Sequence, residues 1–156
     1  MASPRVLKHS REFAASVPHA FDTVLNASLP DIFGRRYAAI APVRQVRSQD
    51  GRWGDVGQTR TIAMSDGVRM QEELTSVHAP RQFTYEITGI KGLMRPLVAK
   101  AEGRWTFDRI GNGVRVTWQW TVHPRNGVAA LGMPLLARMW HGYARQGMEE
   151  LAKILR

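Results

Sequence analysis

The most regular pattern in the chain is an alternation of apolar and polar residues between positions 114 and 123. The apolar series consists of Val114, Val116, Trp118, Trp120 and Val122. The intervening positions hold arginine, threonine and glutamine. A period of two residues is typical of a β-strand, and a single apolar face indicates a sheet that is covered on one side only. This segment therefore predicts one strand of an antiparallel sheet.

Shorter alternating runs, bounded by glycine, proline and aspartate, predict six further strands. We place these strands at residues 6–16, 40–48, 57–64, 68–78, 83–87 and 103–108. Residues 49–52 and 110–113 are predicted turns. Gly92 and Pro96 interrupt the pattern, so residues 89–100 are predicted to be irregular.

Two hairpins have turn sequences that predict their register. Ser65-Asp66-Gly67 suits a three-residue loop with glycine in the left-handed conformation. The pairs expected from this loop are Met64 with Val68, Ile62 with Met70, and Arg60 with Glu72. A two-residue turn at Pro80-Arg81 would make the pairs His78 with Phe83, Ser76 with Tyr85, and Leu74 with Ile87.

A period near 3.6 residues predicts helices at both ends of the chain. Pro18 opens a short helix over residues 18–26, and a second short helical segment covers residues 29–33. Residues 128–156 predict one long helix, with Pro134 in an early turn. Its apolar residues recur about every four positions, at Leu131, Leu135, Met139, Tyr143, Gly147, Leu151 and Leu155. We expect this face to meet the sheet.

Composition narrows the class of protein. A chain of 156 residues is long enough for one domain with its own core, and we expect residues 1–156 to form a single domain. The absence of cysteine excludes disulfides and thiolate metal sites and suits a cytoplasmic location. Residues 1–10 lack the apolar segment of a signal peptide, and no apolar run is long enough for a transmembrane helix.

The formal net charge is +9, which raises the question of an acidic partner. The 22 lysines and arginines are spread along the whole chain, and the polar face of residues 114–123 carries no aromatic side chain. Proteins that bind single-stranded nucleic acid interleave aromatic and basic residues, so we expect no nucleic-acid partner. A weak affinity for acidic partners or anionic membrane surfaces is compatible with this charge.

Motifs of several enzyme classes are missing. The sequence contains no Gly-x-Ser-x-Gly elbow, no phosphate-binding loop and no Gly-x-Gly-x-x-Gly. The five histidines do not have the spacing of metal ligands, and His-Glu-x-x-His is absent. We therefore expect no metal, no cofactor, and neither covalent hydrolysis nor hydride transfer.

Several short motifs occur together in a recognisable order. They are Pro18-His19-Ala20-Phe21-Asp22, Gly54-Asp55-Val56-Gly57, Asp66-Gly67 with Glu73-Leu74, residues 80–87 (PRQFTYEI), residues 103–107 (GRWTF) and residues 114–118 (VRVTW). In this order the chain resembles the SRPBCC or START-like superfamily, especially its bacterial polyketide cyclase/dehydrase and lipid-transport branch. The resemblance implies an α+β helix-grip fold. In that fold a curved seven-stranded antiparallel sheet wraps a long C-terminal helix, with two short helices after the first strand.

Members of this superfamily bind lipids, polyketides or aromatic metabolites between the sheet and the helix. The resemblance thus implies a small hydrophobic ligand as partner and a cavity that holds it. The alternative is that the same side chains fill this space as an ordinary core. The expected ligand-binding residues are Arg60, Ile62, Met70, Glu72, Leu74, Tyr85, Trp105, Phe107, Trp118, Trp120, Met139 and Tyr143. Residues 89–100 lie where this fold has an entrance segment, and they either cover the cavity or pack on the helix. We expect a monomer or a homodimer.

Arg60 and Glu72 are the charged exceptions on the apolar face. A buried charge needs a partner, so they form either a structural ion pair or a polar anchor for a ligand, unless a bulge turns them outward. The leading hypothesis is a non-catalytic binding protein. The alternative is a cyclase, dehydratase or aromatase, for which Glu72, Tyr85 and His78 are the candidate catalytic residues and Arg60 a supporting one.

Overall fold

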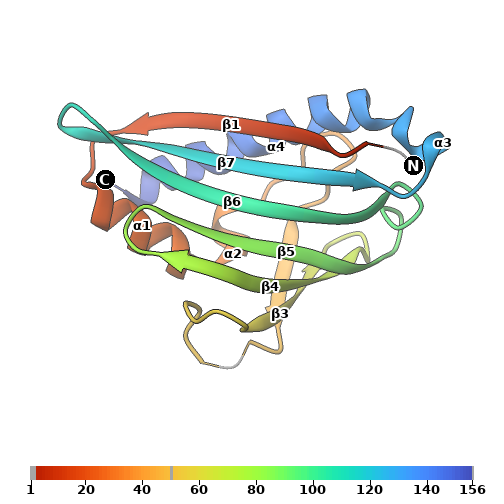
Figure 1. Cartoon of the computed structure of the whole chain (residues 1–156), viewed down its shortest axis with the longest axis horizontal. Coiled ribbons are helices and arrows are strands. Elements are labelled where there is room, and N and C mark those ends of the chain that lie inside the picture. Colours follow the sequence, from red (N-terminus) through yellow and green to blue (C-terminus); the bar gives the residue numbers. More distant parts are fainter. Residues whose placement is uncertain (1–2, 50, 156) are drawn as a thin grey trace.

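The computed structural model describes residues 3–49 and 51–155. Over these residues seven antiparallel strands form one sheet in the order β1-β7-β6-β5-β4-β3-β2. The strands are β1 Arg5–Phe13, β2 Val43–Arg47, β3 Thr59–Met64, β4 Arg69–His78, β5 Gln82–Lys91, β6 Val98–Ile110 and β7 Gly113–Pro124. The sheet is strongly curved (Figure 1), and Asp50 of the predicted turn lies outside the described residues.

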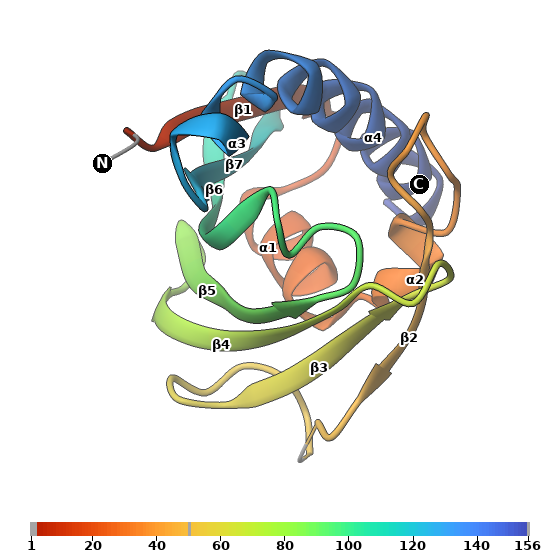
Figure 2. The same cartoon turned by 90° about the vertical axis from the view of Figure 1, so that its right-hand side faces the viewer.

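Four helices complete the described part of the chain. They are α1 Val17–Asn26, α2 Leu29–Ile32, α3 Gly127–Ala130 and α4 Met133–Ile154. Figure 2 shows α4 facing the concave side of the sheet, with α1 and α2 between them. The Ser16 hydroxyl accepts a hydrogen bond from the His19 amide and so starts α1, with Pro18 in the first turn as predicted. The predicted α+β architecture is confirmed.

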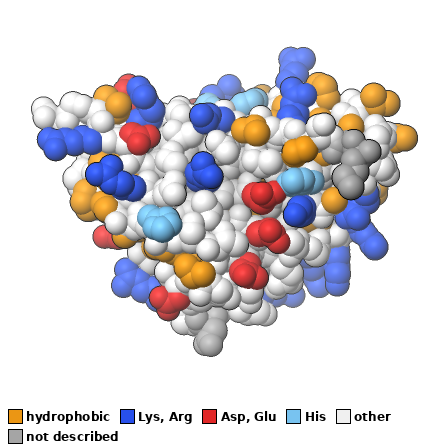
Figure 3. All heavy atoms as spheres, in the orientation of Figure 1, with side chains coloured by type: hydrophobic (Ala, Val, Ile, Leu, Met, Phe, Trp, Pro, Cys, Tyr) orange, Lys and Arg blue, Asp and Glu red, His pale blue; other side chains and the backbone are white. Residues whose placement is uncertain are grey.

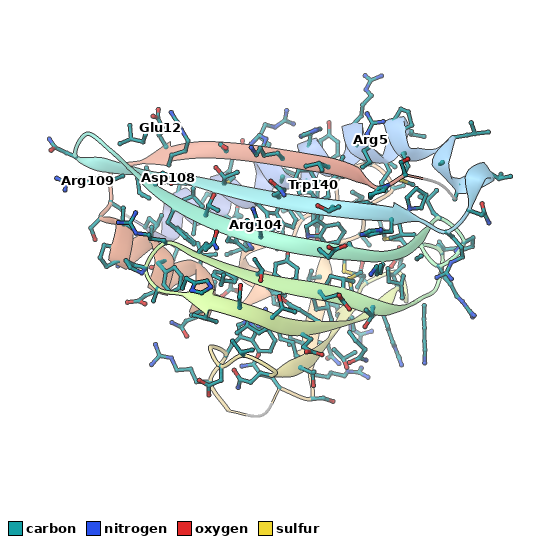
Figure 4. All side chains as sticks on the ribbon, in the orientation of Figure 1. Arg5, Glu12, Arg104, Asp108, Arg109 and Trp140 are labelled. Atoms are coloured by element: carbon teal, nitrogen blue, oxygen red, sulfur yellow. The ribbon has the colours of Figure 1, made fainter. Side chains whose placement is uncertain are left out.

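The alternation of exposed and buried side chains along β6 illustrates that one face of the sheet is buried. Arg104 and Asp108 are exposed (Figure 4). Trp105 and Phe107, which alternate with them, are buried. On the face of the molecule seen in Figure 3, acidic and basic side chains are interspersed. Among the described residues, no helix is both long enough and apolar enough to cross a membrane.

The predicted register of the first hairpin is confirmed. Strand β3 pairs with β4 so that Arg60 lies opposite Glu72 and Ile62 opposite Met70. The Met64 amide donates to the Val68 carbonyl at 2.8 Å, and Gly67 has a φ of 93° in the loop. Glycine tolerates this left-handed conformation, as the three-residue loop requires.

The predicted register of the second hairpin is wrong. His78 lies opposite Gln82 and Val77 opposite Phe83, because the loop has three residues, 79–81, and not two. A shift between Leu74 and Ser76 displaces the pairing by one more residue, so that Leu74 lies opposite Tyr85. An irregularity of this kind reverses the faces of the residues that follow it. Val77 therefore continues the inner face, and His78 is exposed.

The irregular connection is shorter than predicted. Strand β5 extends to Lys91 and β6 begins at Val98, so only residues 92–97 lie between them. Within this segment Leu93 is 80 % exposed, while Leu97 packs against Gly132 at the start of α4. Met94 reaches the interior, so the segment both packs on the helix and contributes to the cavity wall.

The predicted inner face of the C-terminal helix is partly wrong. The helical region is divided into α3 and α4, and Arg156 lies outside the described residues. Leu131 and Leu135 are 82 % and 64 % exposed, and Met139 is only half-buried. A step of four residues turns about 40° beyond a full rotation, because a helix has ~3.6 residues per turn. Seven residues separated by six such steps cannot share one face, and only the second half of the series is buried.

The buried face of α4 instead combines steps of three and four residues, as from Leu136 to Trp140, Tyr143 and Gly147. Its large members are Met133, Leu136, Trp140, Tyr143, Met148 and Leu151. Two glycines on the same helix receive aromatic rings from residues 33–37, since a side chain at Gly142 would overlap Tyr37 and one at Gly147 would overlap Phe33. These two contacts determine which face of α4 turns toward the sheet.

Candidate functional site

A cavity of about 90 Å³ lies between the concave face of the sheet and α4. Its walls are almost entirely apolar and come from the sheet, from α1 and α2, and from α4. An empty apolar cavity of about 150 Å³ is enough to hold benzene, and drug-sized ligands occupy ~300–1,000 Å³. The open space is therefore smaller than a cavity that holds benzene, and a ligand of that size binds only if side chains of the wall move.

Most of the residues expected to bind a ligand lie in the wall of this cavity. They are Arg60, Ile62, Met70, Glu72, Tyr85, Trp105, Trp118, Trp120 and Tyr143. Leu74 and Phe107 are fully buried but pack in the core beside the cavity rather than in its wall. The prediction is wrong for Met139 and His78. Met139 lies on the outer side of α4, and His78 is exposed on β4.

Tyr85 forms the polar centre of the cavity wall. Its hydroxyl oxygen accepts hydrogen bonds from the indole N–H groups of Trp118 and Trp120, both at 2.7 Å. The ring lies over Gly103, its cross-strand neighbour, where any side chain would overlap it. Glycine in the GRWTF segment thus lets the phenol extend across β6 to β7.

Arg60 and Glu72 form a buried ion pair. The Arg60 Nε donates to Glu72 Oε1 at 2.8 Å, and the two side chains are 7 % and 5 % exposed. The guanidinium also lies 3.9 Å from the centre of the Trp53 ring and donates to Gln49 Oε1 at 3.2 Å. The burial of both side chains excludes the alternative in which a bulge turns them outward.

Burial shifts the protonation equilibria of these groups. It raises the pKa of Glu72 above its ordinary value, and the neighbouring Arg60 opposes part of this shift. Burial and then the charge of Glu72 raise the pKa of the Tyr85 phenol, although the two indole donors act in the opposite direction. Tyr85 is therefore a neutral phenol at neutral pH.

Sequence reasoning missed several cavity residues, of which Trp140 and Trp53 are the largest. Trp140 on α4 packs against Trp118 with ring centres 4.6 Å apart. Its spacing of four from Leu136 and three from Tyr143 is the helical signal that could have identified it. Trp53 comes from the connection between β2 and β3, where no periodic pattern exists to reveal it.

Phe33 was also missed. It stacks on Tyr143 at 5.3 Å and contacts Trp118 at 4.8 Å, so it joins the helix to the sheet across the cavity wall. The Tyr143 hydroxyl donates to the Phe33 carbonyl at 3.2 Å. This hydrogen bond holds residue 33 in place after α2.

A second, outer groove of about 630 Å³ adjoins the cavity. It lies between the α1–α2 connection and β2, and Leu29, Trp53 and Arg60 belong to the walls of both spaces. These three side chains are therefore the partition between the interior and the surface. Among the described residues, no three His, Asp or Glu side chains gather as a metal site would require.

The chain belongs to the protein family described as polyketide cyclase / dehydrase and lipid transport, whose pattern it matches over residues 5–156. This membership confirms the resemblance inferred from the short motifs. A search of curated protein sequences finds no significant match.

Solved structures share the fold at low sequence identity. Norcoclaurine synthase from Thalictrum flavum, solved with dopamine and hydroxybenzaldehyde, has a TM-score of 0.71 at 15 % identity, over 97 % of this chain and 86 % of that one. Major latex-like protein 151 from Panax ginseng has a TM-score of 0.70 at 13 % identity, over 99 % of both chains. The protein XoxI from Bacillus cereus has a TM-score of 0.66 at 18 % identity, over 96 % and 94 %. The helix-grip fold is thereby established.

Proposed function

We propose that this protein binds a small, mostly apolar molecule in the cavity between the sheet and α4, and that it does so in the cytoplasm. The observation that carries the proposal is an apolar cavity walled by all five tryptophans of the chain. Flat aromatic walls favour a flat or aromatic guest, since offset and edge contacts between rings are favourable. Membership of a family described by polyketide cyclisation and lipid transport supports a ligand of this kind.

The volume of the cavity ranks the expected classes of ligand by size. An aromatic metabolite requires less enlargement of the 90 Å³ space than a lipid or a polyketide does. A longer ligand would have to extend past Trp53 and Arg60 into the outer groove. Met64, Met70 and Met94 also line the cavity, and their flexible side chains can adjust its shape.

The polar groups of the wall favour binding over catalysis. Glu72 is bonded to Arg60, and the Tyr85 oxygen already accepts two hydrogen bonds. A general acid or base must instead reach the substrate with its reactive atom. His78, a candidate catalytic residue of the cyclase or dehydratase alternative, is exposed and does not line the cavity.

Thermal unfolding with hydrocarbon probes tests the proposal. We expect benzene, α-methylstyrene and naphthalene to raise the Tm in a concentration-dependent manner, because a ligand of the folded state stabilises it by ~2.7 kcal/mol at one hundred times its Kd. Leu135→Ala, on the exposed side of α4, should bind the probes as the unaltered protein does. If none of the probes changes the Tm or the tryptophan fluorescence, the proposal is wrong.

A further inference from the structure

Two buried indole N–H groups of the cavity wall lack a hydrogen-bond partner. Trp118 and Trp120 donate to Tyr85, but the Nε1 atoms of Trp53 and Trp140 have no acceptor among the described residues. Both of these side chains are 3 % exposed, so bulk water does not reach the two donors. Buried polar groups are nearly always paired, and each exception requires a physical reason.

The two tryptophans line the same cavity from different structural elements. Trp140 belongs to α4 and packs on Trp118 of β7, while Trp53 belongs to the β2–β3 connection and lies beneath the Arg60 guanidinium. Figure 4 labels Trp140, and Figure 1 shows its helix behind β1 and β7 in the same orientation. Because both rings line the cavity, a molecule inside it is the natural source of the missing acceptors.

Two acceptors of the wall are already engaged. The Glu72 Oε1 atom accepts a hydrogen bond from Arg60, and the Tyr85 oxygen accepts hydrogen bonds from two indoles. An indole N–H can only donate a hydrogen bond. The cavity wall therefore offers unpaired donors to a ligand.

We propose that the ligand carries a hydrogen-bond-accepting oxygen, such as a ketone, ester or quinone carbonyl, on a small apolar body, and that the indole N–H of Trp140 or Trp53 binds this oxygen. This inference rests on the proposed function and assigns the class of ligand. A ligand with two carbonyl groups would satisfy both indoles. A pure hydrocarbon would leave both donors unpaired. A ligand whose only polar group is a donor would add a third unpaired donor.

Two probes of the same shape separate the acceptor from the apolar body. Acetophenone and α-methylstyrene have the same skeleton, but the first has a carbonyl oxygen where the second has a methylene group. We expect both to bind the unaltered, ¹⁵N-labelled protein. Acetophenone should shift the indole proton resonance of Trp140 or Trp53 downfield, as a new hydrogen bond does, whereas α-methylstyrene should not. Trp140→Phe and Trp53→Phe assign the two resonances.

The substitutions also give a quantitative readout. Phenylalanine keeps an aromatic ring but removes the donor, so at one of the two positions the ratio of the acetophenone Kd to the α-methylstyrene Kd should rise about ten-fold. That factor corresponds to ~1.4 kcal/mol. Phe83→Leu is the matched control, since Phe83 lines the same cavity and has no hydrogen-bond donor to lose. It should change both Kd values by a similar factor.

The outcomes distinguish this inference from the proposed function. If both probes bind but neither indole proton moves downfield and neither substitution changes the ratio, the inference is overturned and apolar binding stands. If neither probe binds, both proposals are overturned. Should a tryptophan substitution prevent folding, the resonance shifts of the unaltered protein with the two probes still decide, because a hydrogen bond moves only the resonance of its own donor.

Discussion

At the scale of single residues, the polar centre of the cavity depends on one oxygen atom. The Tyr85 hydroxyl is the acceptor for both Trp118 and Trp120, and Gly103 leaves the space in which the ring lies. Tyr85 therefore orients two of the five tryptophans in the cavity wall and is also part of that wall itself. Removing only the hydroxyl oxygen abolishes the orientation of the two indoles and leaves the ring in the cavity wall.

We expect Tyr85→Phe to lower the free energy of unfolding by about 2–4 kcal/mol, because it leaves two indole donors without an acceptor at ~1–3 kcal/mol each. Tyr143→Phe is the control, since it removes a single hydrogen bond to the Phe33 carbonyl. That variant should lose only about 1 kcal/mol. Chemical denaturation measures both, and equal losses in the two variants would contradict a special role for Tyr85.

Glu72 gives a prediction about pH. Its pKa in the folded protein is raised above the ordinary value of 4.5, mainly by burial. The folded state then binds a proton more tightly than the unfolded state does. The contribution of Glu72 to stability is therefore greatest at acidic pH and falls as the pH rises from about 4.5 through the folded pKa.

Glu72→Gln tests this direction, because glutamine has the shape of the protonated acid and does not titrate. The free energy of unfolding of the unaltered protein, minus that of the variant, should decrease between pH 4 and pH 8 in denaturation experiments. A difference that grows with pH would mean that Arg60 lowers the pKa more than burial raises it, and the prediction would be wrong.

At the scale of elements, two adjacent residues of α4 lie on opposite sides of the helix. Leu136 is 5 % exposed and lines the cavity, whereas its neighbour Leu135 is 64 % exposed. Leu136→Ala should cost about 2–5 kcal/mol through lost burial and an enlarged cavity. Leu135→Ala should change stability by no more than ~0.5 kcal/mol. Similar melting temperatures for the two variants would show that α4 is rotated from the described position.

At the scale of the whole molecule, the curved sheet leaves space that α4 does not fill. Val122 and Val116 are fully buried in the same phase of β7, but only Val122 borders the cavity. This pair can test whether the space exists in solution, because the same added methyl group meets an opening at one position and packed side chains at the other.

Val122→Ile should raise the free energy of unfolding by up to about 0.8 kcal/mol, as one more methylene group is buried, and should weaken probe binding. Val116→Ile should instead lose ~1–3 kcal/mol through overpacking. Denaturation and probe titration of both variants provide the measurement. A loss of stability in both would indicate that the cavity collapses in solution.

The periodic parts of the fold could be predicted from the sequence because their cause is local. Alternation along residues 114–123 predicted β7, and the Ser65-Asp66-Gly67 loop predicted the pairing of Arg60 with Glu72. In both places a turn geometry or a strand period is fully specified by adjacent residues. The strands, the helices and the apolar face of the sheet follow from these patterns, whereas the helix-grip fold and its cavity were implied by the resemblance to a known superfamily.

Only the tertiary structure decided which side chains finally face the interior. The register shift between Leu74 and Ser76 turns His78 outward. The rotation of α4 is determined by Tyr37 and Phe33 packing on Gly142 and Gly147, residues more than one hundred positions away along the chain. Trp53 enters the cavity from a connection without any period, held beneath Arg60. Each of these features depends on contacts between distant segments, and local propensity does not encode such contacts.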